Sequence, residues 1–154
     1  MTICVECYAD ITLVQKLIGQ NNIKHSGNKS SVLYDLAHHH TSSIGMVDED
    51  PGKSVSGLIR NYREIRNHFA EDILVLYDRR RDNYLISINE DLEDWILKIS
   101  RTCGINISNY SLPNDRERLH RVIRGNLDKF QKLLDDLLPL SDHLILLQKE
   151  LLNP

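Results

Sequence analysis

The sequence predicts an α/β protein with a mostly parallel sheet, helices on its faces and a helical segment at its C-terminal end. Over the first hundred residues, short apolar runs of strand length alternate with segments whose apolar residues recur at helical spacing. Beyond Asn106 the pattern is helical only. Strands that alternate with helices pair in parallel, because each helix returns the chain across a face of the sheet. We therefore expect an α/β domain at residues 1–104 and a helical extension at 105–154.

The first half of the chain contains three expected strands and two expected helices. The first strand holds the apolar run Ile3-Cys4-Val5, and the helix after it has Asp10 as its expected N-cap and Gly19 as its C-cap. A turn at residues 26–30 precedes the second helix. The expected elements, in order, are a strand at 2–6, a helix at 9–19, a strand at 22–25, a helix containing 32–37 and a strand at 43–48.

The second half is expected to begin with a third helix, capped by Ser54 or Ser56, because four apolar residues follow at helical spacing. These residues are Leu58, Tyr62, Ile65 and Phe69. The remaining expected elements are strands at 73–77 and 84–88, a helix at 91–103, a long helix at 114–139 with a weak point at Gly125, and a last helix at 141–152.

Composition narrows the class of protein. The formal net charge is −3, so only local binding of phosphate is expected, without an overall basic field. No apolar stretch approaches the length of a membrane span. Cys4 and Cys7 would point to opposite faces of a strand, so they and Cys103 are expected to be core thiols rather than zinc ligands. Three free thiols without a signal peptide indicate a cytoplasmic protein.

Carboxylates follow two expected strands at the point where each strand ends. Glu6 follows the first apolar run, and Asp48-Glu49-Asp50 follows Ile44-Gly45-Met46-Val47. The carboxyl ends of parallel strands meet at one edge of the sheet, where α/β proteins usually bind ligands. Carboxylates that converge there repel one another, and Mg²⁺ would relieve the repulsion. Acids after strands are also common as polar loop residues and caps, but the joint pattern favours a metal site.

These residues resemble the motifs of the Toprim domain, a fold shared by primases, topoisomerases and nucleases of the overcoming-lysogenization-defect type. The likeness rests on Val5-Glu6 ahead of a helix, on residues 45–50 after a strand, and on the order of the elements between them. Residues 26–32 also resemble the Gly-Lys turn of small, stand-alone, nuclease-like members linked to phage defence. The segment Leu92-Glu93-Asp94-Trp95 resembles an acidic helix start found downstream in some of those members.

The resemblance implies a catalytic, metal-binding site at Glu6, Asp48 and Asp50. In the family, the first Glu is the general acid or base of nucleotidyl transfer or phosphodiester cleavage, and the Asp-x-Asp pair holds Mg²⁺, for which Mn²⁺ can substitute. Cys7 stands where the family often has glycine, and Gly52 stands where topoisomerase-like members have a third Asp. These departures argue against a topoisomerase and favour a small nuclease-like or degenerate member.

Basic residues near the acids are candidates for binding substrate phosphate. Gly52-Lys53-Ser54 lacks the first glycine of a nucleotide P-loop at the required spacing, so Lys53 is instead a candidate to neutralise phosphate beside the metal. Arg79, Arg80 and Arg81 follow the expected strand at 73–77. If that strand is parallel to the others, the three arginines lie at the same edge as the acids and can hold the substrate backbone. For both groups the alternative is a solvated turn.

The leucine-rich end of the chain, residues 133–152, has two interpretations. Its leucines either pack on the α/β domain or form the interface of a homo-oligomer or a protein partner. Because the chain has no ATPase motif, that partner could be an ATPase subunit.

The leading functional prediction is metal-dependent phosphodiester cleavage of nucleic acid, in phage defence or genome maintenance. The first alternative is a non-catalytic Toprim-like interaction subunit that docks through its C-terminal helices. The second is a small-nucleotide phosphotransferase. The observation that discriminates among them is whether the carboxyl groups of Glu6, Asp48 and Asp50 converge.

Overall fold

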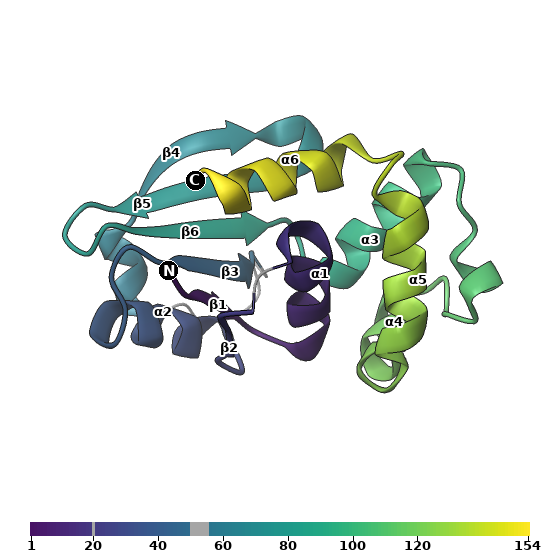
Figure 1. The fold of residues 1–154 in the computed structure, drawn as a ribbon, viewed down its shortest axis with the longest axis horizontal. Coiled ribbons are helices and arrows are strands. Elements are labelled where there is room, and N and C mark those ends of the chain that lie inside the picture. The colour runs from purple at the N-terminus through teal and green to yellow at the C-terminus, as the bar shows by residue number, and fades with distance from the viewer. Residues whose placement is uncertain (20, 50–55) are drawn as a thin grey trace.

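The computed structural model describes residues 1–19, 21–49 and 56–154. Its centre is a six-stranded mixed sheet with the strand order β2-β1-β3-β6-β5-β4 (Figure 1). The expected α/β class, with helices beside the sheet and further helices at the C-terminal end, is confirmed. The strands are β1 (Ile3–Val5), β2 (Ile23–His25), β3 (Ile44–Asp48), β4 (Arg63–His68), β5 (Ile73–Asp78) and β6 (Asn83–Ile88).

Several helices begin at a side chain that accepts a hydrogen bond from their first turn. Asn28, Asp91, Asp115 and Ser141 each cap a helix in this way. No helix in the described ranges is long and apolar enough to cross a membrane. The α-helices are α1 (Tyr8–Ile18), α2 (Lys29–His38), α3 (Leu92–Thr102), α4 (Arg116–Val122), α5 (Leu127–Leu137) and α6 (Asp142–Leu152). The 3-10 turns are η1 (Gly57–Asn61), η2 (Phe69–Glu71), η3 (Ile107–Tyr110) and η4 (Ile123–Asn126).

The sheet has a parallel half and an antiparallel half. Strand β1 pairs in parallel with β2 and β3, and β3 pairs in parallel with β6. Strand β5 runs antiparallel to both β6 and β4. The sequence therefore predicts the parallel half correctly and misses the reversal of the chain direction on the other side of β6.

The helix expected from Ser54 or Ser56 to Phe69 is wrong. Residues 57–61 form η1, and residues 63–68 form the edge strand β4. Of the apolar residues that suggested a helix, Tyr62 is buried, but Ile65 and Phe69 are 42% and 81% exposed. The helical spacing is therefore accidental, and hydrogen bonding to β5 decides the conformation of this segment.

The single long helix expected at 114–139 is also wrong. Gly125 lies in η4, which separates α4 from α5, and a glycine inside a helix costs about 1 kcal/mol relative to alanine. The first of the two helices, α4, has Asp115 as its N-cap. The expected start of the last helix is confirmed, since Ser141 caps α6 and accepts a hydrogen bond from the Leu144 N–H at 3.2 Å.

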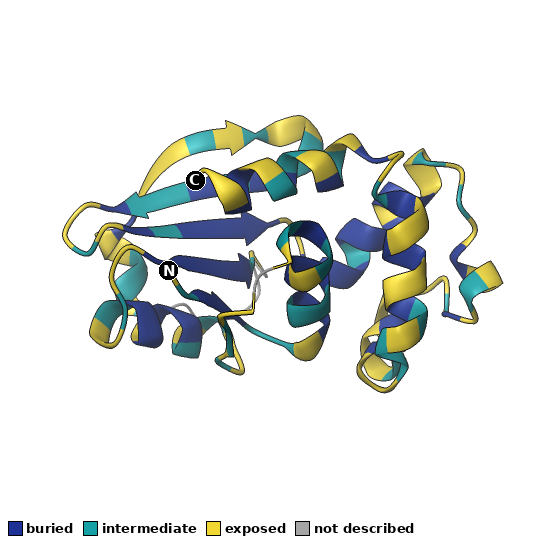
Figure 2. Ribbon diagram, in the orientation of Figure 1, coloured by how far each residue is buried: buried dark blue, intermediate teal, exposed yellow. Residues whose placement is uncertain are grey.

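Two apolar clusters hold the helices against the sheet, and their residues form the buried interior in Figure 2. The smaller cluster joins α2 and η1 to the sheet. There a Cβ on Gly45 would lie 2.6 Å from Leu36 Cδ1, so glycine permits the close approach of α2 to β3. The larger cluster joins the sheet to α1, α3, α4, α5 and α6. Its members include most leucines of the C-terminal end: Leu133, Leu134, Leu137, Leu144, Leu147 and Leu151.

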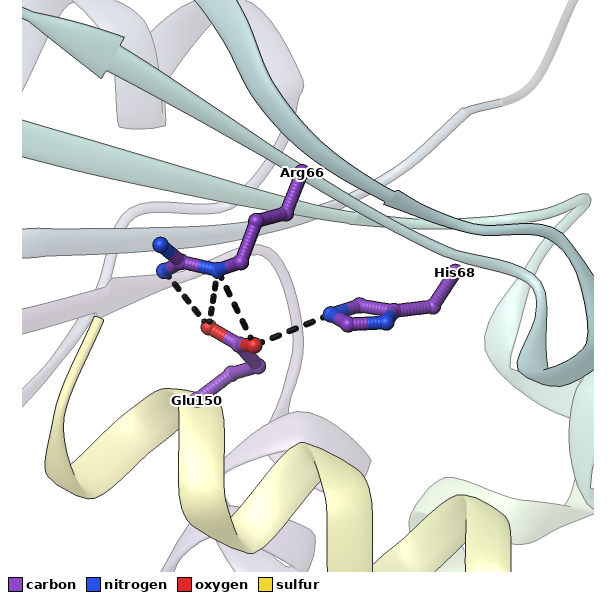
Figure 3. A network of polar contacts seen from close by, with 3 residues as sticks. All are labelled: Arg66, His68 and Glu150. Carbon is purple, nitrogen blue, oxygen red and sulfur yellow. Dashed lines mark hydrogen bonds and ion pairs between the residues drawn. The ribbon is translucent and has the colours of Figure 1, made fainter.

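A buried carboxylate fixes α6 to the edge strand β4 (Figure 3). Glu150 is 4% exposed, and its Oε2 accepts a hydrogen bond from Arg66 Nη2 at 2.8 Å. Its other oxygen lies 2.9 Å from His68 Nε2. Burial disfavours the charge of Glu150, but the hydrogen bonds from Arg66 and His68 outweigh it and hold the pKa of Glu150 below its usual value.

Replacing Glu150 by glutamine should therefore weaken the fold in a pH-dependent way. We expect Glu150→Gln to lower the free energy of unfolding by about 2 kcal/mol at neutral pH, a figure reduced from that of a fully buried pair because Arg66 is partly exposed. A lowered folded-state pKa contributes stability above the unfolded pKa, and that contribution is lost as pH falls through the folded value. Urea unfolding of parent and variant should therefore converge in acid. Glu64→Gln, at an exposed glutamate of the same strand, is the matched control, and an equal loss in both variants would contradict the assignment.

Candidate metal site at the carboxyl edge of the sheet

The parallel strands β1, β3 and β6 end at one edge of the sheet, and two helices begin there. Asp48, the last residue of β3, is in register with Ile88, the last residue of β6, and the Glu49 N–H donates to the Ile88 carbonyl oxygen at 2.9 Å. Helix α1 starts shortly after β1, and α3 starts shortly after β6. The first turns of both helices therefore lie at the same edge as the strand ends.

The structure brings Glu6 and Asp48 together at this edge. The Asp48 N–H donates a hydrogen bond to Glu6 Oε2 at 2.7 Å, across the carboxyl ends of β1 and β3. The backbone N–H of Asp48 therefore orients the Glu6 side chain. Asp48 is also the residue that the resemblance to Toprim domains pairs with Glu6. Asp50 and Lys53, the other predicted site residues of this region, lie outside the described residues.

Asp10 adds a buried carboxylate from the first turn of α1. It is 3% exposed, and its Oδ2 accepts a hydrogen bond from the Cys7 N–H at 2.9 Å. Cys7, rather than Asp10, is the N-cap residue, so the expected capping role of Asp10 is wrong by three positions. Burial raises the pKa of Asp10 to about 7, and the charges of Glu6 and Glu93 act in the same direction.

Two more carboxylates come from the start of α3. Asp91 caps the helix by accepting a hydrogen bond from the Asp94 N–H at 2.9 Å, and it forms an ion pair with Arg116 of α4. Glu93 is 5% exposed and lies 2.9 Å from Nδ1 of His120, also of α4. The acidic helix start was expected here from the sequence, but no role was predicted for these residues. The available signal was the Asp-x-Glu pair Asp91 and Glu93, which begins three residues after the end of a strand.

Asp48 experiences the combined charge of these residues. Burial is the main reason why its pKa rises to about 9, and the neighbouring carboxylates raise it further. In order of decreasing effect, these neighbours are Asp10, Glu6, Glu93 and Asp91. At neutral pH and without a cation, Asp48 therefore keeps its proton, which is unusual for an aspartate and typical of functional sites.

The donor set fits a hard divalent cation. Glu6, Asp10 and Asp48 offer carboxylate oxygens, the ligands that Mg²⁺ prefers, whereas Asp91 and Glu93 already contact Arg116 and His120. A cation would lower the cost of ionising Asp10 and Asp48. Within the described residues, no three His, Cys, Asp or Glu side chains already lie in positions to share one ion. The fit therefore rests on the type, burial and electrostatics of the side chains.

The predicted position of Arg79, Arg80 and Arg81 beside the acids is wrong. Strand β5 runs antiparallel to β6, so the turn that follows β5 lies at the opposite edge of the sheet. There the Ser42 N–H, just before β3, donates to the Arg81 carbonyl oxygen at 3.0 Å, and Arg81 Nε donates to the Ala37 carbonyl oxygen at 2.6 Å. The connection between the two strands is too short for a parallel crossover, which needs a dozen or more residues.

Comparison of the chain with models of protein families, with curated proteins and with solved structures gave no match. The likeness to Toprim proteins therefore stays a prediction from the sequence.

The raised pKa of Asp48 predicts how stability changes with pH when no metal is present. Between about pH 4 and about pH 9 the unfolded chain loses the Asp48 proton while the folded chain keeps it, so stability falls as pH rises. Asp48→Asn removes this dependence. In EDTA, its melting temperature should exceed that of the parent by a margin that grows with pH. Asp128→Asn, at an exposed aspartate of α5, should show no such trend. A margin that stays constant with pH would contradict the electrostatic account.

Proposed function

We propose that this chain is a Toprim-like, metal-dependent enzyme that cleaves phosphodiester bonds in nucleic acid. One observation carries the proposal. The hydrogen-bonded pair of Glu6 and Asp48 lies at the carboxyl edge of parallel strands, where neighbouring acids raise the pKa of Asp48 to about 9. Crowded carboxylates lower stability if their role is purely structural. In a functional site they would instead bind a cation, which would also contact a substrate phosphate.

The arrangement of the strands supports the Toprim-like assignment. Strands β2, β1, β3 and β6 are parallel neighbours, and α1 and α2 connect the first three along the chain. Glu6 follows the first strand and Asp48 ends the third, as the resemblance requires. Phage defence or genome maintenance is the biological setting that the resemblance suggests for such an enzyme.

Four acidic residues have a role in this proposal. Glu6, Asp48 and Asp50 would hold Mg²⁺ or Mn²⁺, which when bound would supply Lewis-acid stabilisation of the charge that develops on a substrate phosphate oxygen. Glu6, oriented by the Asp48 N–H, accepts the proton of the attacking water. Asp10, held by the Cys7 N–H, contributes negative charge next to this pair. Lys53 remains a predicted contact to the substrate phosphate.

Glu6→Gln tests the role of the general base, because glutamine keeps the shape of the side chain and lacks its basicity. With plasmid DNA and RNA as substrates and Mn²⁺ or Mg²⁺ present, turnover should fall by about 10²- to 10⁴-fold while substrate binding remains. Asp48→Asn should lose both turnover and the rise in melting temperature that Mn²⁺ gives the parent. Asp128→Asn, purified in the same way, controls for contaminating nuclease. Undiminished cleavage by Glu6→Gln and Asp48→Asn would overturn the proposal.

The second candidate is a non-catalytic interaction subunit, and exposed apolar residues at the C-terminal end favour it. Leu140, Ile145 and Leu152 are 60%, 49% and 54% exposed. Ile145 and Leu152 are seven residues apart on α6 and therefore share one face of the helix. These residues, unlike the buried leucines of the larger cluster, are available for a homo-oligomer or for a protein partner such as an ATPase subunit.

Light scattering tests self-association through this face. The interaction-subunit candidate predicts that the parent is larger than a monomer and that Ile145→Glu yields a smaller, folded species. Lys132→Glu introduces a glutamate at an exposed position of another helix, α5, and serves as the control. A monomeric parent at tens of micromolar would exclude self-association through α6.

A further inference from the structure

We propose that an arginine-lined hollow at the sheet edge opposite the acids binds the phosphate backbone of nucleic acid. The hollow has a volume of about 810 Å³. Its basic residues are Arg60, Arg63, Arg79 and Arg80, and we call this cavity the arginine hollow.

The arginine hollow lies far from the candidate metal site along the strands. Arg63 pairs with Tyr77 across β4 and β5, and the same row of the sheet continues through Tyr84 to Ile44 at the start of β3. Asp48 stands four residues further along β3, which corresponds to about 13 Å. In Figure 1 the turn after β5 accordingly lies at the end of the sheet away from α1 and α3. The two sites are therefore separate parts of the surface.

Three separate segments supply the four arginines. Arg60 comes from η1, Arg63 begins β4, and Arg79 and Arg80 follow β5. All four are exposed, and within the described residues none of their guanidinium groups is paired with a carboxylate.

Two arginines close to them in the sequence behave differently. Arg66 is bound by Glu150, and Arg81 donates to the Ala37 carbonyl oxygen. The four guanidinium groups of the hollow thus remain available to bind a ligand, whereas those of Arg66 and Arg81 bind other parts of the protein.

Two acidic residues near the hollow, Asp78 and Asp82, are already engaged by other partners. Asp78 contributes to the lining, but it is 4% exposed and its Oδ1 accepts a hydrogen bond from the Arg80 N–H at 2.9 Å. Asp82 accepts hydrogen bonds from the hydroxyls of Tyr77 and Ser42, each at 2.8 Å. In a chain with a net charge of −3, this edge therefore carries a local excess of positive charge.

The exposure and spread of the four arginines favour a phosphate backbone over a small ligand. Sites for small molecules bury most of the ligand surface and are mainly apolar. Here the arginines are exposed and spread over three segments, an arrangement that suits a row of phosphates on an extended polyanion. Arginine forks bind phosphate oxygens bidentately. A duplex carries one charge per about 1.7 Å of its axis, so it offers several phosphates between this edge and the acidic edge.

The binding of a short fluorescent DNA duplex in EDTA tests the inference, since it needs no metal and no cleavage. We expect Arg79→Gln/Arg80→Gln and, separately, Arg60→Gln/Arg63→Gln to weaken binding by about tenfold or more. Each double change should also reduce the slope of log Kd against log salt by about 2. Arg118→Gln/Arg121→Gln removes the same charge from exposed positions of α4 and should leave both quantities unchanged. Equal melting temperatures of all variants verify folding.

Three results would overturn the inference. They are a parent that does not bind the duplex, an equal loss of affinity in the α4 control, and displacement of the duplex by inorganic tripolyphosphate at lower phosphate concentration than unlabelled duplex requires. The last result would make the hollow a site for small polyphosphates. Because the assay omits metal, its outcome is independent of whether the acids cleave nucleic acid. Binding without metal-dependent cleavage would refute only the proposed enzyme, and cleavage without loss of binding in the hollow variants would refute only the hollow.

Discussion

The hydrogen bond from the Asp48 N–H to the Glu6 carboxylate is the interaction on which the candidate site depends. It joins the carboxyl ends of two central strands and holds one acid against the backbone of another. Burial and the surrounding carboxylates then oppose the ionisation of Asp48, whose pKa rises to about 9. The protein keeps this unfavourable arrangement at the edge of the sheet where α/β proteins bind ligands, and a cation is the simplest species that would relieve it.

The helices set the electrostatics of this edge. The N-termini of α1 and α3 place Asp10 and Glu93 near the strand ends, and helix N-termini favour negative charge. That effect is smaller than the cost of burial, as the raised pKa of Asp10 shows. The C-terminal segment takes part as well, because Arg116 and His120 of α4 contact Asp91 and Glu93. The segment expected as an extension therefore supplies side-chain partners for two of the acids at this edge.

The sequence was sufficient for the parts of the fold in which local pattern and tertiary structure agree. The apolar runs at β1 and β3, with Glu6 and Asp48 after them, predict strands whose ends meet. The prediction failed at β4, where Leu58 and Ile65 fall at helical spacing by coincidence and pairing with β5 prevails. It also failed for the position of Arg79, which depends on the direction of β5. The sequence did show that the turn after β5 is too short for a parallel crossover, but the prediction did not use that length. Asp10 was missed because burial cannot be read from one sequence.

Proton release on metal binding tests the central claim most directly. A carboxylate must be deprotonated to bind a cation, and the pKa values of Asp48 and Asp10 are about 9 and about 7. Calorimetric titration with Mn²⁺ at about pH 7, in buffers of different ionisation enthalpy, should therefore show roughly one to two protons released per bound ion. Asp48→Asn should abolish or weaken the binding and reduce the count. Binding of Mn²⁺ without proton release, or no binding at millimolar Mn²⁺, would contradict the account.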